Sequence, residues 1–194
     1  MADYKIALTE LSIVEGGYAN NKLDSGGETY RGISRNNWPS WPGWAIVDRK
    51  RGDENFPNNL DSDKVLQSWV ENFYQINFWN QVRGNDLPDQ ELANQLLNIA
   101  VNIGNGIHRA SLWLQQSLNM LNNRQLRWPD IDEDGAVGNI TLAILNKAIK
   151  AGYIKEIMAS VRIMQGNFYQ QLVKNKPDQE IFYVSWLRRV GLIK

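Results

Sequence analysis

Apolar residues recur at helical spacing along most of this 194-residue chain, and one glycine-rich interval interrupts the pattern. Seven segments carry apolar side chains three or four positions apart, as one buried face of an α-helix requires. Residues 16–33 contain five glycines and no such stripe, which favours tight turns and a small sheet. We therefore expect a mostly α fold with a two- or three-stranded sheet after the first helix. The expected helices cover residues 3–15, 61–80, 88–103, 107–121, 139–150, 153–174 and 182–190.

Capping residues place several of these helix ends. Asp61 or Ser62 can cap the second helix, and Pro88 suits the first helical position of the third. Gly104 supplies a stop, and Asn139 can cap the helix that it precedes.

Two stretches lack helical periodicity over a long interval. Residues 37–60 are rich in Trp, Pro, Asn and Gly, and we expect a long ordered loop that can include one helical turn. Residues 122–138 separate helical segments. We expect one lobe over 1–90 and a helical lobe over 91–194 that pack as one compact unit.

Composition excludes several classes of function. The 21 basic residues balance 21 acidic ones, so the chain lacks the field that holds a polyanion, and nucleic-acid binding is not expected. The absence of cysteine excludes disulfides, thiol catalysis and zinc–thiolate sites. The single histidine, His108, excludes multi-histidine metal sites and is expected at the surface of a helix start. No basic-then-apolar leader and no run of about 18 apolar residues is present, so we expect a chain that is cytoplasmic as synthesised and has no membrane span. We also expect a monomer.

Aromatic and amide side chains are abundant. Eight Trp, seven Tyr and five Phe accompany many Asn and Gln, a combination that suits carbohydrate because sugar faces stack on rings and hydroxyls pair with amides. Trp38, Trp41 and Trp44 form either such a platform, with Trp41 as a substrate contact, or anchors that pin their loop to the core.

Two carboxyl groups flank the glycine-rich turn. Glu15 ends the first apolar stripe, where the negative end of the helix dipole and burial would raise its pKa, as a general acid requires. Asp24 lies in a turn where water and backbone N–H groups keep a carboxylate ionised, and the Thr29 hydroxyl can help to hold a water. A carboxyl pair of this kind is the minimal apparatus for cleaving a glycosidic bond. Solvated turn carboxyls with no catalytic role are the alternative.

The same residues resemble a known family. EGGY at 15–18, DSGGET at 24–29 and GIS at 32–34 resemble the signature of glycoside hydrolase family 108, the phage-type N-acetylmuramidases or endolysins. NIAVNIG at 98–104 and the AxxWLQ that follows at 110–115 resemble its core helices. DxDGxxGxxT at 132–141 resembles the predicted peptidoglycan-binding segment that accompanies it, so the resemblance covers about residues 1–185.

The resemblance implies a lysozyme-like helical fold and hydrolysis of the β-1,4 bond between N-acetylmuramic acid and N-acetylglucosamine, with peptidoglycan glycan strands as the partner. It implies Glu15 as the catalytic acid, with Asp24 and Thr29 as its assistants. Phage lysozymes share the Glu-to-Asp separation, whereas the Asp-to-Thr interval here is one residue shorter. Glu28 competes with Asp24 as the second carboxylate. No metal or cofactor is required.

Further residues are candidates for substrate contact. Tyr18 and Tyr30 flank the turn and either touch sugar or pack the turn on the helical body. Asn98 and Asn102 lie four apart on one helix and either bind N-acetyl groups or tether neighbouring segments. Asp132 and Asp134 begin like a calcium loop, but position twelve is Ala143 in place of Glu, which favours a turn that leads into the next helix.

Two other functions remain open at this point. One is a non-catalytic wall-binding or secretion-accessory protein on a lysozyme scaffold, and the other is a lytic transglycosylase. Because peptidoglycan lies outside the inner membrane, the family context implies release through a holin of prophage type or a dedicated export route.

Overall fold

The computed structural model describes residues 1–11, 16–20 and 27–193. These residues form two compact units, Asp3–Asn80 and Gln81–Lys194, the second of which includes Met1–Ala2. The boundary predicted from the sequence lies about ten residues further along, at 90/91. Within the described ranges, the structure contains no helix with both the length and the apolarity that membrane crossing requires.

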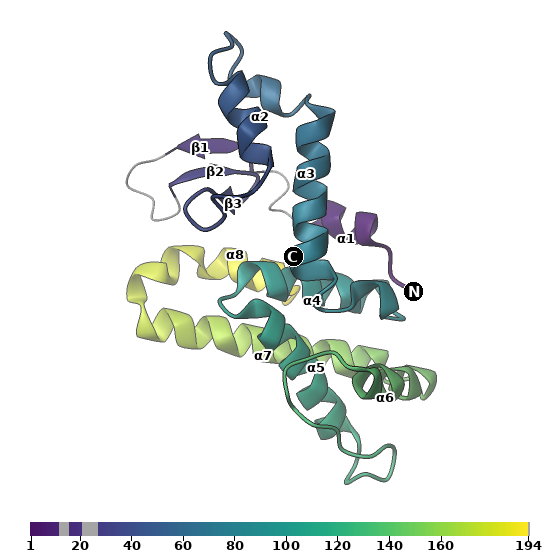
Figure 1. The fold of residues 1–194 in the computed structure, drawn as a ribbon. Coiled ribbons are helices and arrows are strands. Elements are labelled where there is room, and N and C mark those ends of the chain that lie inside the picture. Colours follow the sequence, from purple (N-terminus) through teal and green to yellow (C-terminus); the bar gives the residue numbers. More distant parts are fainter. Residues whose placement is uncertain (12–15, 21–26, 194) are drawn as a thin grey trace. The chain divides into compact units, whose positions relative to one another are not determined.

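The first unit combines a small sheet with three helices (Figure 1). The sheet is antiparallel with strand order β1-β2-β3, and α2 lies beside it. A π-helical turn, Gln75–Trp79, continues the third helix. The elements are α1 (Tyr4–Glu10), β1 (Tyr18–Asn20), β2 (Glu28–Tyr30), β3 (Ile33–Ser34), α2 (Gly43–Lys50) and α3 (Lys64–Tyr74).

A two-residue turn fixes the register of the second hairpin. Arg31 and Gly32 both have positive φ, 48° and 76°, as the type I′ turns that suit β-hairpins require. The turn pairs Tyr30 with Ile33 across the strands, and both of these side chains are fully buried. The Tyr74 hydroxyl donates to the Arg31 carbonyl at 2.7 Å, so α3 holds the strained residue of the turn in place.

Among the residues described, all regular secondary structure of the second unit is helical (Figure 1). Helix α5 packs against α4, α6 and α7, and α7 packs in turn against α8. The buried face of α4 includes Leu92, Leu96 and Ile99, which are spaced as the sequence pattern predicted. The helices are α4 (Gln90–Asn102), α5 (Gly106–Leu121), α6 (Asn139–Lys150), α7 (Ile154–Asn175) and α8 (Glu180–Val190).

The mostly α fold with a small sheet after the first helix is confirmed, and two element boundaries are corrected. Helix α1 was expected over 3–15 but ends at Glu10, because Leu11 adopts an extended conformation. The expected loop 37–60 contains helix α2, which begins directly after Pro42. Proline at that point costs no hydrogen bond because the first N–H groups of a helix have no intrahelical partner. The prolines therefore precede the helix and do not prevent it.

The predicted caps are wrong by one or two positions. Asp63, and neither Asp61 nor Ser62, caps α3 by accepting from the N–H groups of Val65 and Leu66. Helix α4 begins at Gln90 after the cap Asp89, two residues later than the predicted first helical residue Pro88. Gly138 precedes α6 in place of the predicted cap Asn139. The Asn139 side chain accepts from Arg83 at 2.7 Å.

Candidate active site

The two carboxyl groups singled out in the sequence lie outside the described residues. Glu15 belongs to the interval 12–15 and Asp24 to the interval 21–26. Their roles stay predictions. The described residues nevertheless define the hairpin on either side of Asp24, because β1 ends at Asn20 and β2 begins at Glu28.

Thr29 occupies the middle of the central strand. It pairs with Ala19 on one side and Ser34 on the other. Its hydroxyl donates to the Gly27 carbonyl at 3.3 Å, and the residue is half-buried. Because side chains alternate along a strand, Thr29 lies on the opposite face of the sheet from Glu28 and Tyr30.

Glu28 lies at the centre of a charged cluster. Its Oε1 is 2.6 Å from an Arg51 guanidinium nitrogen, and its Oε2 is 2.6 Å from Arg35 Nε. The Tyr18 hydroxyl also donates to Oε1 at 2.8 Å. Only 10% of the Glu28 side chain is exposed, so two cations and one phenol replace its lost hydration. Both carboxylate oxygens of Glu28 are thus engaged.

Asp48 of α2 joins the two arginines to each other. Both of its oxygens accept from Arg35, at 2.6 and 3.0 Å, and Oδ1 also accepts from Arg51 at 3.1 Å. The hydrogen bond from Arg35 is the largest cause that lowers the pKa of this carboxyl, and Arg51 adds to the effect. The Arg35 guanidinium also lies over the Trp44 ring, 4.4 Å from its centroid. We call Glu28, Arg35, Asp48 and Arg51 the hairpin clamp, because they fix β2 and β3 to α2.

The sequence did not predict the ion pairs of the hairpin clamp. The half-buried strand position of Glu28 would require cationic partners once the strand was known, but nothing in the sequence selects Arg35 and Arg51 among 21 basic residues. Their choice depends on where α2 lies beside the sheet, and α2 was itself expected as a loop.

The two tyrosines flank the hairpin as expected. Tyr18 is half-buried, and its ring packs edge-on against Phe56 at 4.8 Å. Burial, followed by the hydrogen bond to Glu28, raises the pKa of its hydroxyl. Tyr30 is fully buried, with its hydroxyl bonded to Gln67 at 2.8 Å and to Asp61 at 3.2 Å. These ring contacts and hydrogen bonds hold both tyrosines against the rest of the unit. Sugar contact by either tyrosine stays a prediction.

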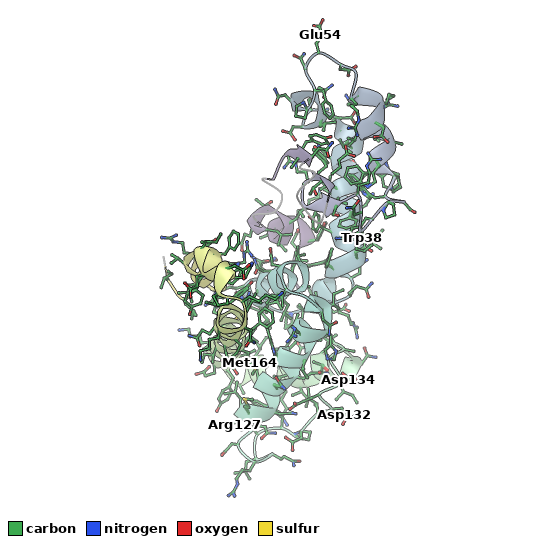
Figure 2. The ribbon with its side chains drawn as sticks, turned by 90° about the vertical axis from the view of Figure 1, so that its left-hand side faces the viewer. Trp38, Glu54, Arg127, Asp132, Asp134 and Met164 are labelled. Atoms are coloured by element: carbon green, nitrogen blue, oxygen red, sulfur yellow. The ribbon has the colours of Figure 1, made fainter. Side chains whose placement is uncertain are left out.

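The three tryptophans differ in exposure. Trp41 is 7% exposed and Trp44 is 3% exposed, and their rings meet edge-to-face at 5.1 Å. Trp38 keeps 40% of its surface exposed and meets Phe73 edge-to-face at 4.9 Å (Figure 2). Trp41 and Trp44 therefore anchor the segment to the core. Burial weighs against Trp41 as a glycan contact, and Trp38 retains more of its accessible surface.

The amides of α4 connect it to α7. Gln95 donates to Gln165, and Gln165 donates to Asn98 at 3.4 Å. The Asn102 amide donates to the Asn98 carbonyl one turn back, at 3.0 Å. Asn98 thus takes part in a tether between helices, which was one of the two expectations for it. Both residues remain partly exposed, and their contact with N-acetyl groups stays a prediction.

The acidic loop between α5 and α6 is organised by an amide. Asp134, which follows Asp132 on this loop (Figure 2), accepts from Gln115 at 2.7 Å and from the Ala136 N–H at 2.9 Å. These hydrogen bonds, the one from Gln115 first, lower the pKa of Asp134. His108 packs on Gly135, whose φ is +72°, and an added Cβ would lie 1.9 Å from His108 Nδ1. Among the described residues, no group of three or more acidic or histidine side chains could hold a metal ion.

These features define a mostly helical, lysozyme-like protein with a clamped hairpin in its N-terminal half. Residues 8–104, half of the chain, match the model of the family described as glycosyl hydrolase 108. Residues 109–191 match a second family, described as a predicted peptidoglycan domain. The chain belongs to the glycosyl hydrolase 108 family. With the second matched region, this makes it a glycoside hydrolase that acts on peptidoglycan.

The fold also has a counterpart among solved structures. The chain is similar to Brucella abortus SagA, at 23% sequence identity, over 97% of this chain and 89% of that one, with a TM-score of 0.57. At this identity the likeness supports the fold alone. No curated protein sequence is significantly similar to the chain.

Proposed function

We propose that the protein is an N-acetylmuramidase. It hydrolyses the β-1,4 bond between N-acetylmuramic acid and N-acetylglucosamine in the glycan strands of peptidoglycan. The observation that carries the proposal is the match of residues 8–104 to the glycosyl hydrolase 108 family, because this range includes Glu15, Asp24, Thr29 and the whole hairpin.

In the proposed mechanism, Glu15 is the general acid. It protonates the glycosidic oxygen as the bond to the sugar C1 breaks. Asp24 either activates the attacking water or stabilises the oxocarbenium ion that develops on the sugar ring. Thr29 lies on β2, five residues after Asp24 in the sequence, and its hydroxyl assists in placing the water.

The environment of Glu28 supports the choice of Asp24 over Glu28 as the second carboxylate. Glu28 pairs through one oxygen with Arg35 and through the other with Arg51 and Tyr18. A carboxylate whose two oxygens are each paired with an arginine is fixed in the clamp, and its charge is already balanced by these two cations. It also lies on the opposite strand face from Thr29, so the two cannot hold one water between them. We assign Glu28 to positioning of the hairpin.

Analysis of the products tests the proposal. Purified peptidoglycan is digested with the full chain, and the fragments are identified by mass spectrometry. A muramidase yields reducing N-acetylmuramic acid ends, each carrying the added water. Anhydro-muramyl ends would identify a lytic transglycosylase, and sedimentation with the wall without any fragment release would identify a binding or secretion-accessory protein; either result would overturn the proposal.

We further propose that the enzyme reaches its substrate after synthesis in the cytoplasm, through a holin or an export system. Fractionation of the cells that produce it tests this step. The proposal predicts that wall-associated protein appears only when the holin or the export system is active. Wall association without either would contradict it.

A further inference from the structure

A groove lies between α5 and α7 of the second unit, far along the sequence from the hairpin. Its volume is about 380 Å³, and its lining combines apolar and polar side chains. The apolar part consists of Trp113, Phe168 and Met164, the last of which is labelled on α7 in Figure 2. Every lining residue falls within 109–171, and hence inside the range that matches the predicted peptidoglycan domain.

Arg109 is the one cation of the groove. Its guanidinium lies 4.8 Å from the centroid of the Phe168 ring, and its Nε donates to the Gly104 carbonyl at 3.0 Å. Two fixed contacts thus hold the side chain, which reduces the entropy that a ligand would have to overcome. No carboxylate of the described residues forms an ion pair with Arg109, and the lining contains no acidic side chain. The terminal guanidinium nitrogens therefore offer donors to an anion.

Amides form the rest of the polar lining. Gln116, Asn167 and Gln171 each present a donor and an acceptor, and the last two are exposed on α7. An amide recognises a peptide bond through paired N–H and C=O groups. The groove therefore matches a ligand that carries both a carboxylate and peptide amides.

The aromatic rings of the groove disfavour a sugar as the ligand. Carbohydrate stacks on open ring faces, but Trp113 is only 7% exposed. The Phe168 ring is occupied by the Arg109 guanidinium and by contact with Trp113, whose centroid lies 6.1 Å away. The rings line the groove without offering a free stacking platform.

We propose that this groove binds the acidic stem peptide of peptidoglycan. Arg109 pairs with a peptide carboxylate, and the three amides bond to the peptide backbone. This inference deepens the proposed function, since it supplies a peptide-binding site for an enzyme whose chemistry is on the glycan. It predicts that the second unit distinguishes wall that carries peptides from bare glycan.

Calorimetric titration of the full chain tests the proposal. The ligands are a synthetic stem peptide with free carboxylates, the same peptide with its carboxylates converted to amides, and a tetramer of N-acetylglucosamine. We expect the amidated peptide to bind about tenfold or more weakly than the acidic one. The sugar tetramer should not displace the acidic peptide. Equal binding of acidic and amidated peptide, or displacement by the sugar, would overturn the proposal.

Matched variants localise the binding. Arg109→Gln should weaken binding of the acidic peptide about tenfold, while Arg109→Lys recovers part of the loss because it keeps the charge. Asn167→Asp adds a like charge at an exposed helix position and should also weaken binding, even if Arg109→Gln fails to fold. Gln170→Glu is the matched control. It adds the same charge on α7, but Gln170 does not line the groove, so binding should be unchanged. Unchanged binding in Asn167→Asp would overturn the proposal.

The titration does not depend on cleavage. The synthetic peptides contain no glycosidic bond, so their binding is measured independently of wall cleavage. A protein that binds the acidic peptide but releases no reducing ends from peptidoglycan would refute the muramidase proposal and leave the groove proposal intact. A protein that cleaves peptidoglycan but does not bind the acidic peptide would refute the proposal for the groove alone.

Discussion

The two units of the molecule differ in the interactions that stabilise each of them internally. In Asp3–Asn80, a sheet of three short strands is fixed to α2 by the hairpin clamp, in which four charged side chains meet within 3.1 Å. In Gln81–Lys194, helices pack through fully buried apolar side chains such as Leu96, Leu114 and Val161. Strands of two or three residues bury too little surface to hold a position by themselves. The hairpin next to the proposed catalytic residues therefore depends on ion pairs in addition to its buried side chains, such as Tyr30 and Ile33, whereas the helical unit depends mainly on apolar burial.

The largest effect on stability should come from the apolar core of the helical unit. Leu96→Ala removes a fully buried side chain from α4 and should cost about 2–5 kcal/mol of unfolding free energy. Hydrogen exchange should show faster exchange in α4, α5 and α7, while strands β1, β2 and β3 keep their protection. Equal loss of protection in the hairpin would show that the two units unfold together, and would contradict the claim that they are stabilised separately.

Breaking the clamp should have the converse effect. Glu28→Gln removes the charge that faces Arg35 and Arg51, and should cost about 1–3 kcal/mol, discounted because Arg51 is 43% exposed. Hydrogen exchange should become faster in β2 and β3, and the rate of peptidoglycan cleavage should decrease because the hairpin is less well held.

Glu54→Gln is the matched control, since Glu54 is exposed on the loop after α2 (Figure 2). A Glu28→Gln protein with the stability and activity of this control would contradict the role of the clamp.

The turn of the second hairpin gives a smaller effect. Gly32→Ala places a Cβ at φ 76° and should cost about 1–2 kcal/mol, because L-residues are strained in the left-handed region. Thermal unfolding measures the loss. Gly52→Ala is the control, since an added Cβ there meets no atom within 4 Å. A similar melting temperature for the two variants would argue against strain at the turn.

The smallest effect concerns the cap of α3 and depends on pH. Hydrogen bonds from the N–H groups of Leu66 and Val65, with Lys50 nearby, lower the pKa of Asp63. The charged form therefore stabilises the fold above the unfolded pKa near 4, and the contribution is lost as pH falls through the lower folded value.

Asp63→Ala should cost about 1 kcal/mol at pH 7, and the difference from wild type should shrink in acid. Asp63→Asn keeps the cap but loses the charge, so it should retain most of the stability and show a weaker pH dependence. Chemical unfolding from pH 7 to pH 3 measures both. A cost of Asp63→Ala that stays constant with pH would show that the charge contributes nothing.

The comparison also separates what the sequence could predict from what it could not. Every α-helix described in Gln81–Lys194 was predicted to within a few residues, because a buried helix face imposes its spacing on the sequence. In Asp3–Asn80 the five glycines of 16–33 predicted the sheet, but helix α2 was missed because Pro39 and Pro42 mask the apolar spacing of Trp44 and Val47.

The candidate site was predictable only in part. The position of the hairpin follows from local turn chemistry, which a sequence displays directly. The two arginine partners of Glu28 lie 7 and 23 residues away along the chain, and the three side chains meet because α2 lies beside the sheet. Caps were misplaced by one or two residues since several neighbouring polar residues can each cap a helix, and tertiary contacts such as that of Arg83 with Asn139 decide among them.

The release of reducing ends from purified peptidoglycan by Glu15→Gln, compared with the wild-type chain, tests the central claim most directly. The substitution keeps the shape of the side chain and removes the proton that the leaving oxygen requires. We predict a fall in rate of about a hundredfold or more, with an unchanged thermal unfolding curve. A folded Glu15→Gln protein that releases reducing ends at the wild-type rate would contradict the proposed mechanism.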